Sequence, residues 1–279
     1  MAASLVGFGQ RYDMLKGHLQ MMLFPGELEK WSQRHYGKVV PLCEVIQQRH
    51  PLFLFSGDVG TGKTVMAECA ANRITNDLGK DGFLLKLSTR VRGKGLHGEM
   101  NQLLQDAFEH LKLQAGKKRL AFLLVDEADS IASLRSTEQM HQEEKSAVNT
   151  LIQKIDEIRS VGGRAALFLC TNRAEIIDQA IVRRAALHME FPRPTKEDFV
   201  ELLEMDLDGM GLSQREVQKL ASLISKGGHY ADVGYTFSDC RLRFLPSVAM
   251  KALAAGSKAT FDIFKDSVSE VKPSPSITP

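Results

Sequence analysis

The chain has 279 residues, 43% of them hydrophobic and 25% charged, which suits one or two globular domains with a substantial core. Its 36 lysines and arginines nearly balance its 34 aspartates and glutamates, so it lacks the strong net charge that steers polyanions to a protein. No charged segment precedes an apolar stretch at the N-terminus and no apolar run approaches ~18 residues, which predicts a cytoplasmic chain without a signal peptide or a membrane span.

Three helices are predicted ahead of residue 50. Apolar residues recur at helical spacing over 12–24, and a Pro-Gly pair ends that helix. Residues 27–35 and 40–48 form the next two. The pattern then switches to short continuous apolar runs, which are typical of strands buried on both faces. These predicted strands cover residues 52–55, 83–87, 120–125 and 165–170, with a weaker strand at 188–191.

Predicted helices alternate with these strands, at residues 63–78, 98–113 and 143–158. Such alternation predicts an α/β fold with a parallel sheet and right-handed crossovers. Beyond the Pro-Arg-Pro sequence at 192–194, only helices are predicted, at 195–205, 213–226, from 238 onward and at 260–271. We therefore expect an α/β domain over 1–192, a helical lid domain over 193–272 and a disordered tail over 273–279.

The four cysteines lie far apart and form no C-x-x-C pair. They are Cys43, Cys69, Cys170 and Cys240. This spacing supports neither a zinc site nor a disulfide framework, and it predicts buried free thiols.

A glycine-rich string follows the first predicted strand and opens the helix predicted over 63–78. It reads Gly57-Asp58-Val59-Gly60-Thr61-Gly62-Lys63-Thr64. Glycines let the backbone curl so that successive N–H groups point at phosphate oxygens, and the helix N-terminus adds positive charge. In such a loop Lys63 reaches the β- and γ-phosphates and Thr64 coordinates Mg²⁺, so the sequence predicts ATP and Mg²⁺ as cofactors. The alternative is a glycine-rich turn that binds no ligand.

Polar residues follow two later strands. Asp126, at the end of the strand predicted over 120–125, suits the Mg²⁺ shell, and Glu127 is placed to polarise a water for attack on the γ-phosphate. The alternative for this pair is a helix N-cap with a first-turn acid. Asn172 follows the strand predicted over 165–170 and can orient the attacking water, although by itself it is equally typical of a turn. The order of the three motifs favours the catalytic interpretation.

These motifs together resemble those of the AAA+ ATPases, with Walker A at 57–64, Walker B at 123–127 and sensor 1 at Asn172. The resemblance covers nearly the whole chain. It implies the AAA+ P-loop NTPase fold, with a five-stranded parallel sheet and a helical lid, and it implies ATP hydrolysis. Val6 and Gly7, ahead of the first helix, are similar to the segment that contacts adenine in that superfamily.

Residues 178–185 look like the stretch that carries the arginine fingers of the family, with Arg184 as the first candidate and Arg183 as the second. An arginine supplied by a neighbouring subunit stabilises charge on the transferring phosphoryl group, so the resemblance implies a closed homo-hexamer. The alternative is a solvated basic pair at the end of a helix.

The family also places a sensor 2 arginine early in the third lid helix. This chain departs from the pattern, because Cys240 stands where the arginine is expected. Arg241 and Arg243 are the candidates to reach the γ-phosphate instead. A surface or structural role for either arginine is the alternative.

Within AAA+, the chain resembles the pachytene checkpoint remodellers, in their compact bacterial type. The similar segments are residues 148–149, 155–158, 171–172, 175–185 and 238–246. That family opens closed HORMA-domain proteins by pulling their N-terminal segment through the pore of the ring. The bacterial relatives accompany a HORMA protein and a cyclic-nucleotide synthase in CBASS anti-phage operons. The resemblance therefore implies a HORMA-domain substrate and control of antiviral signalling.

The segment after the second predicted strand is expected to face the pore and touch the substrate. Its candidate contact residues are Arg92, Lys94, Gly95, Leu96 and His97. Translocases of the family usually carry an aromatic residue where Gly95 stands, so strong processive threading is not expected. An ordinary flexible turn is the alternative.

Two other functions compete with protein remodelling. A nucleic-acid or clamp loader of the same fold would use cations such as those at 90–94 and 117–119, but the near-neutral charge opposes it. A nucleotide switch without turnover is opposed by the presence of Lys63, Asp126 and Glu127.

Overall fold

The computed structural model describes residues 5–88, 99–117, 119–133, 142–159, 161–230 and 232–277. As far as it is described, the chain forms two compact units. The sheet unit comprises Gly9–Ser56 and Thr64–Glu190, and the lid unit comprises Met1–Phe8, Gly57–Lys63 and Phe191–Pro279. Most of the predicted phosphate loop thus groups with the lid. The domain boundaries at 192 and 272 stay a prediction.

Five strands form one sheet in the order β2-β3-β4-β1-β5. They are β1 (Leu52–Gly57), β2 (Gly82–Ser88), β3 (Leu120–Asp126), β4 (Ala165–Thr171) and β5 (Leu187–Phe191). The pairs β1–β4, β3–β4 and β2–β3 are parallel. Because β3 and β4 are parallel neighbours, with Val125 beside Leu169, the polar residues that follow them share one edge of the sheet. The predicted α/β fold with a five-stranded sheet is confirmed.

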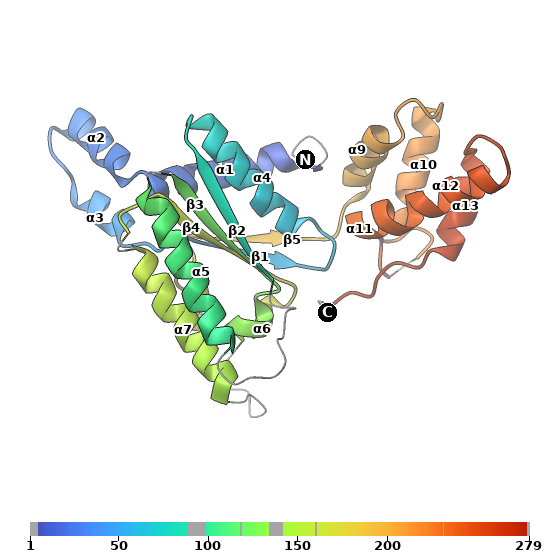
Figure 1. The fold of residues 1–279 in the computed structure, drawn as a ribbon. Coiled ribbons are helices and arrows are strands. Elements are labelled where there is room, and N and C mark those ends of the chain that lie inside the picture. The colour runs from blue at the N-terminus through green and yellow to red at the C-terminus, as the bar shows by residue number, and fades with distance from the viewer. Residues whose placement is uncertain are drawn as a thin grey trace. The chain divides into compact units, whose positions relative to one another are not determined.

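Helices cover both faces of the sheet. In Figure 1, α5 (Glu99–Gly116) and α7 (Gln142–Arg159) lie along one side, and α1 (Phe8–Leu23) and α4 (Lys63–Asp77) along the other. Side chains alternate across each strand, so Leu54, Val125 and Leu167 share a buried cluster with α5 and α7. The phenylalanines at 53, 55, 122 and 168 contact one another in a separate group. Burial on both faces explains the continuous apolar runs of β1, β3 and β4. The same expectation is wrong for residues 83–87, because β2 lies at the edge of the sheet and its residues alternate between half-buried and exposed.

The shorter elements of the sheet unit are α2 (Pro25–Tyr36), α3 (Pro41–Gln47), α6 (Asp129–Ala132), η2 (Ala174–Ile176) and α8 (Gln179–Val182). The three predicted N-terminal helices are confirmed, but the first begins at Phe8 and not at residue 12. Its buried side chains start at Tyr12 and continue through Leu15 and Leu19. The turn ahead of Tyr12 buries no side chain, so it leaves no apolar periodicity in the sequence.

The lid unit is helical, as predicted. Its elements are α9 (Lys196–Asp206), α10 (Gln214–Ile224), α11 (Phe237–Asp239), η3 (Cys240–Phe244), α12 (Leu245–Ala254) and α13 (Phe261–Glu270). Thr195, Ser213 and Thr236 each close a capping box, in which a hydroxyl and an acidic side chain satisfy the free amides of the first turn. The third lid helix therefore begins at Phe237, earlier than the predicted Ser238, because Thr236 supplies the cap.

A π-helical turn, η3, joins α11 to α12 without a break in the helix. Pro246 lies in the first turn of α12. A proline has no amide hydrogen and its ring clashes with the carbonyl four residues earlier, which a regular α-helix cannot accommodate. The wider π turn removes that conflict, so Pro246 lies at the start of α12 and the helix continues through a local change in helix type.

The C-terminal residues differ from the prediction of a disordered tail. Residues 273–277 have defined hydrogen-bond partners, among them Asp58 and Asp239. Sequence reasoning missed this because the tail offers no apolar face, and its partners are buried carboxylates far away in the chain.

The side chains at positions 43, 69, 170 and 240 agree with the prediction of buried free thiols. Among the described residues, no helix is long and apolar enough to cross a membrane.

Candidate functional site

The phosphate loop has the backbone shape that its glycines predict. Gly57, Gly60 and Gly62 have φ angles of 141°, 77° and 97°, which side-chain-bearing residues rarely adopt. Lys63 donates from Nζ to the carbonyl oxygens of Gly57 at 2.8 Å and Asp58 at 2.7 Å. The lysine thus folds back over its own loop, and a phosphate bound there would compete with these two carbonyls for the ammonium group.

We expect Gly57→Ala to destabilise the fold by about 3 kcal/mol or more. The added Cβ would lie 2.1 Å from the carbonyl oxygen of Phe191, at a φ that alanine avoids. Gly17→Ala is the matched control, because a Cβ there meets nothing within 4 Å and alanine favours a helix by up to about 1 kcal/mol. Urea unfolding measures both changes, and equal free energies of unfolding would contradict the steric argument.

Thr64 and the carboxylate at the end of β3 meet at the start of α4. The Thr64 hydroxyl donates to Asp126 Oδ1 at 3.1 Å. Lys86, on β2, lies with Nζ 3.8 Å from Asp126 Oδ2 and 3.0 Å from Glu68 Oε1. A hydroxyl beside a carboxylate is a donor set that suits Mg²⁺, which prefers oxygen ligands and retains several waters. The pairing predicted for Thr64 and Asp126 is present in the structure.

Glu127 has an unusual backbone. Its φ is 55°, in the left-handed region that costs a non-glycine residue roughly 1–2 kcal/mol. Its amide donates to Asp126 Oδ1 at 3.1 Å, and its carbonyl accepts the Ser130 hydroxyl at 3.0 Å. These contacts hold the sharp turn that ends β3. Strain of this kind is characteristic of functional positions.

The ends of β3 and β4 are joined directly. The amide of Ala128 donates to the carbonyl of Cys170 at 2.8 Å, and the Thr171 hydroxyl donates to Asp129 Oδ1 at 3.1 Å. These bonds place Asn172 next to the acidic turn, as expected for a residue that orients a water. The sheet unit therefore brings together Thr64, Asp126, Glu127 and Asn172.

The two candidate arginine fingers differ in their surroundings. Arg184 forms a bidentate ion pair with Asp156, at 2.7 Å from Nε to Oδ1 and 3.0 Å from Nη2 to Oδ2. His50 Nε2 lies 2.8 Å from the same carboxylate. The hydrogen bonds from Arg184 lower the pKa of Asp156, so this carboxylate stays charged. Arg183 is exposed. The ion pair fixes the direction of Arg184, which a solvated basic pair would not require.

The candidate sensor 2 arginines are both paired within the lid unit. Arg241 makes a bidentate pair with Asp206 at 2.6 and 2.8 Å, and Arg243 donates to Asp239 at 3.1 Å. Arg243, with half of its side chain exposed, keeps more freedom to reach a ligand than Arg241. Which of them serves as sensor 2 stays a prediction.

The candidate adenine segment also belongs to the lid unit. Val6 is 1% exposed and packs among the buried lid residues, and Gly7 has a φ of 66°. The side chain of Val6 is therefore buried in the lid core. The backbone of this segment would then be the part that contacts the adenine base. The predicted pore-loop residues Arg92, Lys94, Gly95, Leu96 and His97 lie outside the described residues.

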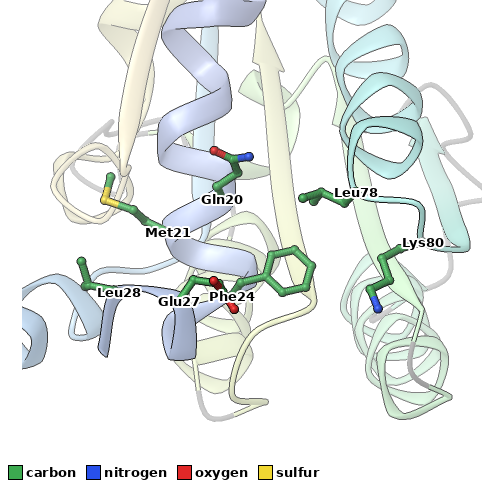
Figure 2. Close-up of a pocket in the computed structure, with 7 residues that line it drawn as sticks. All are labelled: Gln20, Met21, Phe24, Glu27, Leu28, Leu78 and Lys80. Carbon is green, nitrogen blue, oxygen red and sulfur yellow. The ribbon is translucent and has the colours of Figure 1, made fainter. Parts of the chain in front are cut away.

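A surface pocket of about 540 Å³ lies on the sheet unit, away from these motifs. It is lined by Gln20, Met21, Phe24, Glu27, Leu28, Leu78 and Lys80. Figure 2 shows Phe24 and Leu78 projecting into it from opposite sides. Its mixed lining holds none of the glycines, hydroxyls or paired carboxylates that bind phosphate and metal, so we assign it no part in nucleotide chemistry.

Sequence reasoning missed three partners of the site. Lys86 was detectable as the one cation in an apolar strand, and it approaches Asp126. Asp156 lies in a helix whose sequence gives no indication of Arg184 as its partner. Arg193, beside a turn-forming proline, pairs with Asp58 of the phosphate loop at 2.6 Å.

Several known proteins are similar to this chain. The pattern that defines the ATPase family associated with various cellular activities (AAA) matches residues 53–193. The chain is 43% identical over 272 residues to CD-NTase-associated protein 6 of Escherichia coli strain KTE188, which covers 97% of this chain and 90% of that relative.

Two solved structures are also similar. One is described as the E. coli MS115-1 HORMA:CdnC:Trip13 complex, with a TM-score of 0.87 and 33% identity over 99% of this chain and 92% of that chain. The other is described as Rhizobiales Trip13, with a TM-score of 0.71 and 29% identity over 97% and 92%.

Proposed function

Since this chain belongs to the AAA family of ATPases and, within it, resembles the Trip13-like CD-NTase-associated proteins, we propose that it opens or disassembles a complex built on a HORMA-domain protein. The similarity to a chain of the HORMA:CdnC:Trip13 complex, over nearly the full length of both chains, is the observation that carries this proposal. The process controlled would be second-messenger signalling in a cytoplasmic CBASS system.

The chemistry assigned to the site is ATP hydrolysis with Mg²⁺. The phosphate loop would hold the nucleotide, with Lys63 on the terminal phosphates. Thr64 and Asp126 would hold Mg²⁺, which when bound neutralises charge between the phosphates. Glu127 would take a proton from the attacking water, and Asn172 would orient that water.

A ring of subunits completes the site in this proposal. Arg184 lies on the sheet unit, 2.7 Å from Asp156, and is directed by that carboxylate. In a head-to-tail hexamer it would reach the nucleotide of the next subunit, where a guanidinium stabilises the charge of the transferring phosphoryl group. ATP turnover would then require assembly.

The test is a reconstitution with the HORMA protein and the nucleotide synthase from the same source. We expect the wild-type chain with ATP to separate a preformed complex of the two, as seen by size-exclusion chromatography. Glu127→Gln should bind the complex with ATP and fail to separate it. A complex that stays intact with the wild-type chain and ATP would contradict the proposed substrate.

A nucleic-acid loader would give a different pattern. DNA would bind in a salt-sensitive way and stimulate ATP turnover. A nucleotide switch would show no turnover at subunit concentrations either above or below those that assemble the ring. Turnover only above the assembly concentration, unaffected by DNA, supports the remodeller.

A further inference from the structure

The C-terminal residues 274–277, which we call the strap, contact the phosphate loop within the lid unit. The hydroxyl of Ser276 donates to Asp58 Oδ2 at 3.1 Å, and the amide of Ile277 donates to Asp58 Oδ1 at 3.0 Å. Asp58 is the second residue of the loop and is 5% exposed. A buried carboxylate needs such donors, because a charge that is buried without hydrogen-bond partners loses its hydration and gains nothing in return.

Arg193 connects the same carboxylate to the strap backbone. Its Nε donates to Asp58 Oδ2 at 2.6 Å, and its Nη2 donates to the carbonyl oxygens of Ser274 at 2.8 Å and Pro275 at 3.0 Å. Its Nη1 donates to the carbonyl of Gly234 at 2.6 Å, ahead of the third lid helix. One guanidinium thus joins the loop, the strap and the lid.

A second buried carboxylate receives the other end of the strap. The amide and hydroxyl of Ser274 donate to Asp239 at 3.1 and 2.6 Å. Asp239 is 1% exposed and also closes the capping box of the third lid helix with Thr236. Burial opposes ionisation of Asp58 and Asp239, yet the hydrogen bonds from the strap and its neighbours lower the pKa of both. Both therefore stay charged at neutral pH and keep their need for these donors.

The position of Asp58 affects the residues that would meet phosphate. Its carbonyl accepts Lys63 Nζ at 2.7 Å and the Thr61 hydroxyl at 2.8 Å. Both carboxylate oxygens of Asp58 are held by hydrogen bonds, so the orientation of the peptide group that follows Asp58 is also restricted. The strap therefore constrains the part of the loop that positions the lysine.

The strap sequence is suited to this task. Pro273 and Pro275 restrict φ at alternate positions, which lowers the entropy lost when the segment is ordered. Ser274 and Ser276, between and after them, supply the hydroxyl donors. Ordering so short a segment therefore costs less than for a flexible sequence of equal length.

We propose that the strap is a positioning segment for the nucleotide site, which preorganises the phosphate loop through Asp58 and ties it to the third lid helix through Asp239. This inference rests on the proposed ATP site at residues 57–64. It assigns the strap no contact with the nucleotide, and its effect on affinity comes from the shape of the loop.

The test measures binding of ADP by titration calorimetry. A chain that ends at Pro273 should bind ADP about tenfold more weakly than the full chain, the order expected when hydrogen bonds to a buried charge are lost. Asp58→Asn should weaken binding by a similar factor. Because both changes break the same contact between Asp58 and the strap, the combined variant should be little weaker than either alone. Ser257→Ala, at an exposed turn of the lid unit, is the matched serine control and should bind as the wild type does.

Hydrogen exchange provides a readout that needs no nucleotide. The amides of residues 58–62 should exchange faster in the shortened chain than in the full chain. If the shortened chain does not fold, the full-length variant with both Ser274→Ala and Ser276→Ala carries the same expectation. The strap's role would be overturned if the shortened chain bound ADP as the full chain does. It would also be overturned if the losses of affinity caused by the shortening and by Asp58→Asn multiplied in the combined variant. Either result would leave the proposed ATP site intact. Failure of the wild-type chain to bind ADP would overturn the ATP site and the strap's role with it.

Discussion

Glu127→Gln is expected to lower the rate of ATP hydrolysis by about a hundredfold to ten-thousandfold, the range that a positioned general base contributes. Glutamine has nearly the same size and can occupy the same strained turn at φ 55°, but it cannot accept a proton from water. Lys63, Thr64 and Asp126 are unchanged, so ATP should still bind. Single-turnover hydrolysis and nucleotide affinity, measured on the same preparation, separate these two effects.

Glu175→Gln provides the control for this substitution. Glu175 lies just beyond the end of β4, with 54% of its side chain exposed, and it pairs only loosely with Arg173 at 3.4 Å. Its replacement removes one negative charge near the site and should leave turnover within about twofold, because exposed ion pairs contribute little. Wild-type turnover by Glu127→Gln would show that another group is the base.

Arg184→Ala is expected to lower the turnover rate by about a thousandfold or more without loss of ATP binding, which is the effect of removing an arginine finger. The bidentate contact with Asp156 directs Arg184 but is partly exposed, so its loss should barely change the stability of the subunit. Turnover at saturating ATP, together with thermal unfolding of the same variant, distinguishes a catalytic effect from a structural one.

Mixed assemblies show whether Arg184 acts on a neighbour. Lys63→Ala and Arg184→Ala should each be inactive alone, and mixing them should restore part of the activity. In a mixed ring, an Arg184→Ala subunit with an intact loop can lie beside a Lys63→Ala subunit with an intact arginine. Arg183→Ala is the matched control and should retain most of its activity. If instead Arg183→Ala loses turnover and Arg184→Ala does not, the exposed arginine is the finger.

Local sequence predicted much of the fold and the centre of the site. Continuous apolar runs identified β1, β3 and β4 because these strands are buried on both faces. Glycines at 57, 60 and 62 predicted the loop, since their backbone angles are accessible to few other residues. The resemblance to the AAA+ ATPases implied a five-stranded parallel sheet, but no local pattern predicted the order of its strands, β2-β3-β4-β1-β5.

The partners of these residues could not be predicted in the same way. Asp156 precedes Arg184 by 28 residues and Asp58 precedes Ile277 by 219, and nothing in the local sequence links either pair. The left-handed backbone of Glu127 also has no sequence signature, because non-glycine residues rarely adopt it. The sequence therefore identifies candidate site residues, whereas the distant residues that hold them in position are seen only in the structure.

The strap also affects the order in which the chain matures. Its bond from Ile277 to Asp58 closes the largest loop among the hydrogen bonds described, and contacts of such long range form late. During synthesis the glycine loop emerges early, yet the strap residue that binds Asp58 Oδ1 is made 219 residues later. Until then Arg193 is the side-chain partner available to Asp58 among the described residues, so a growing chain carries a phosphate loop that is only partly held, and ATP binds at full strength only after the strap has been made.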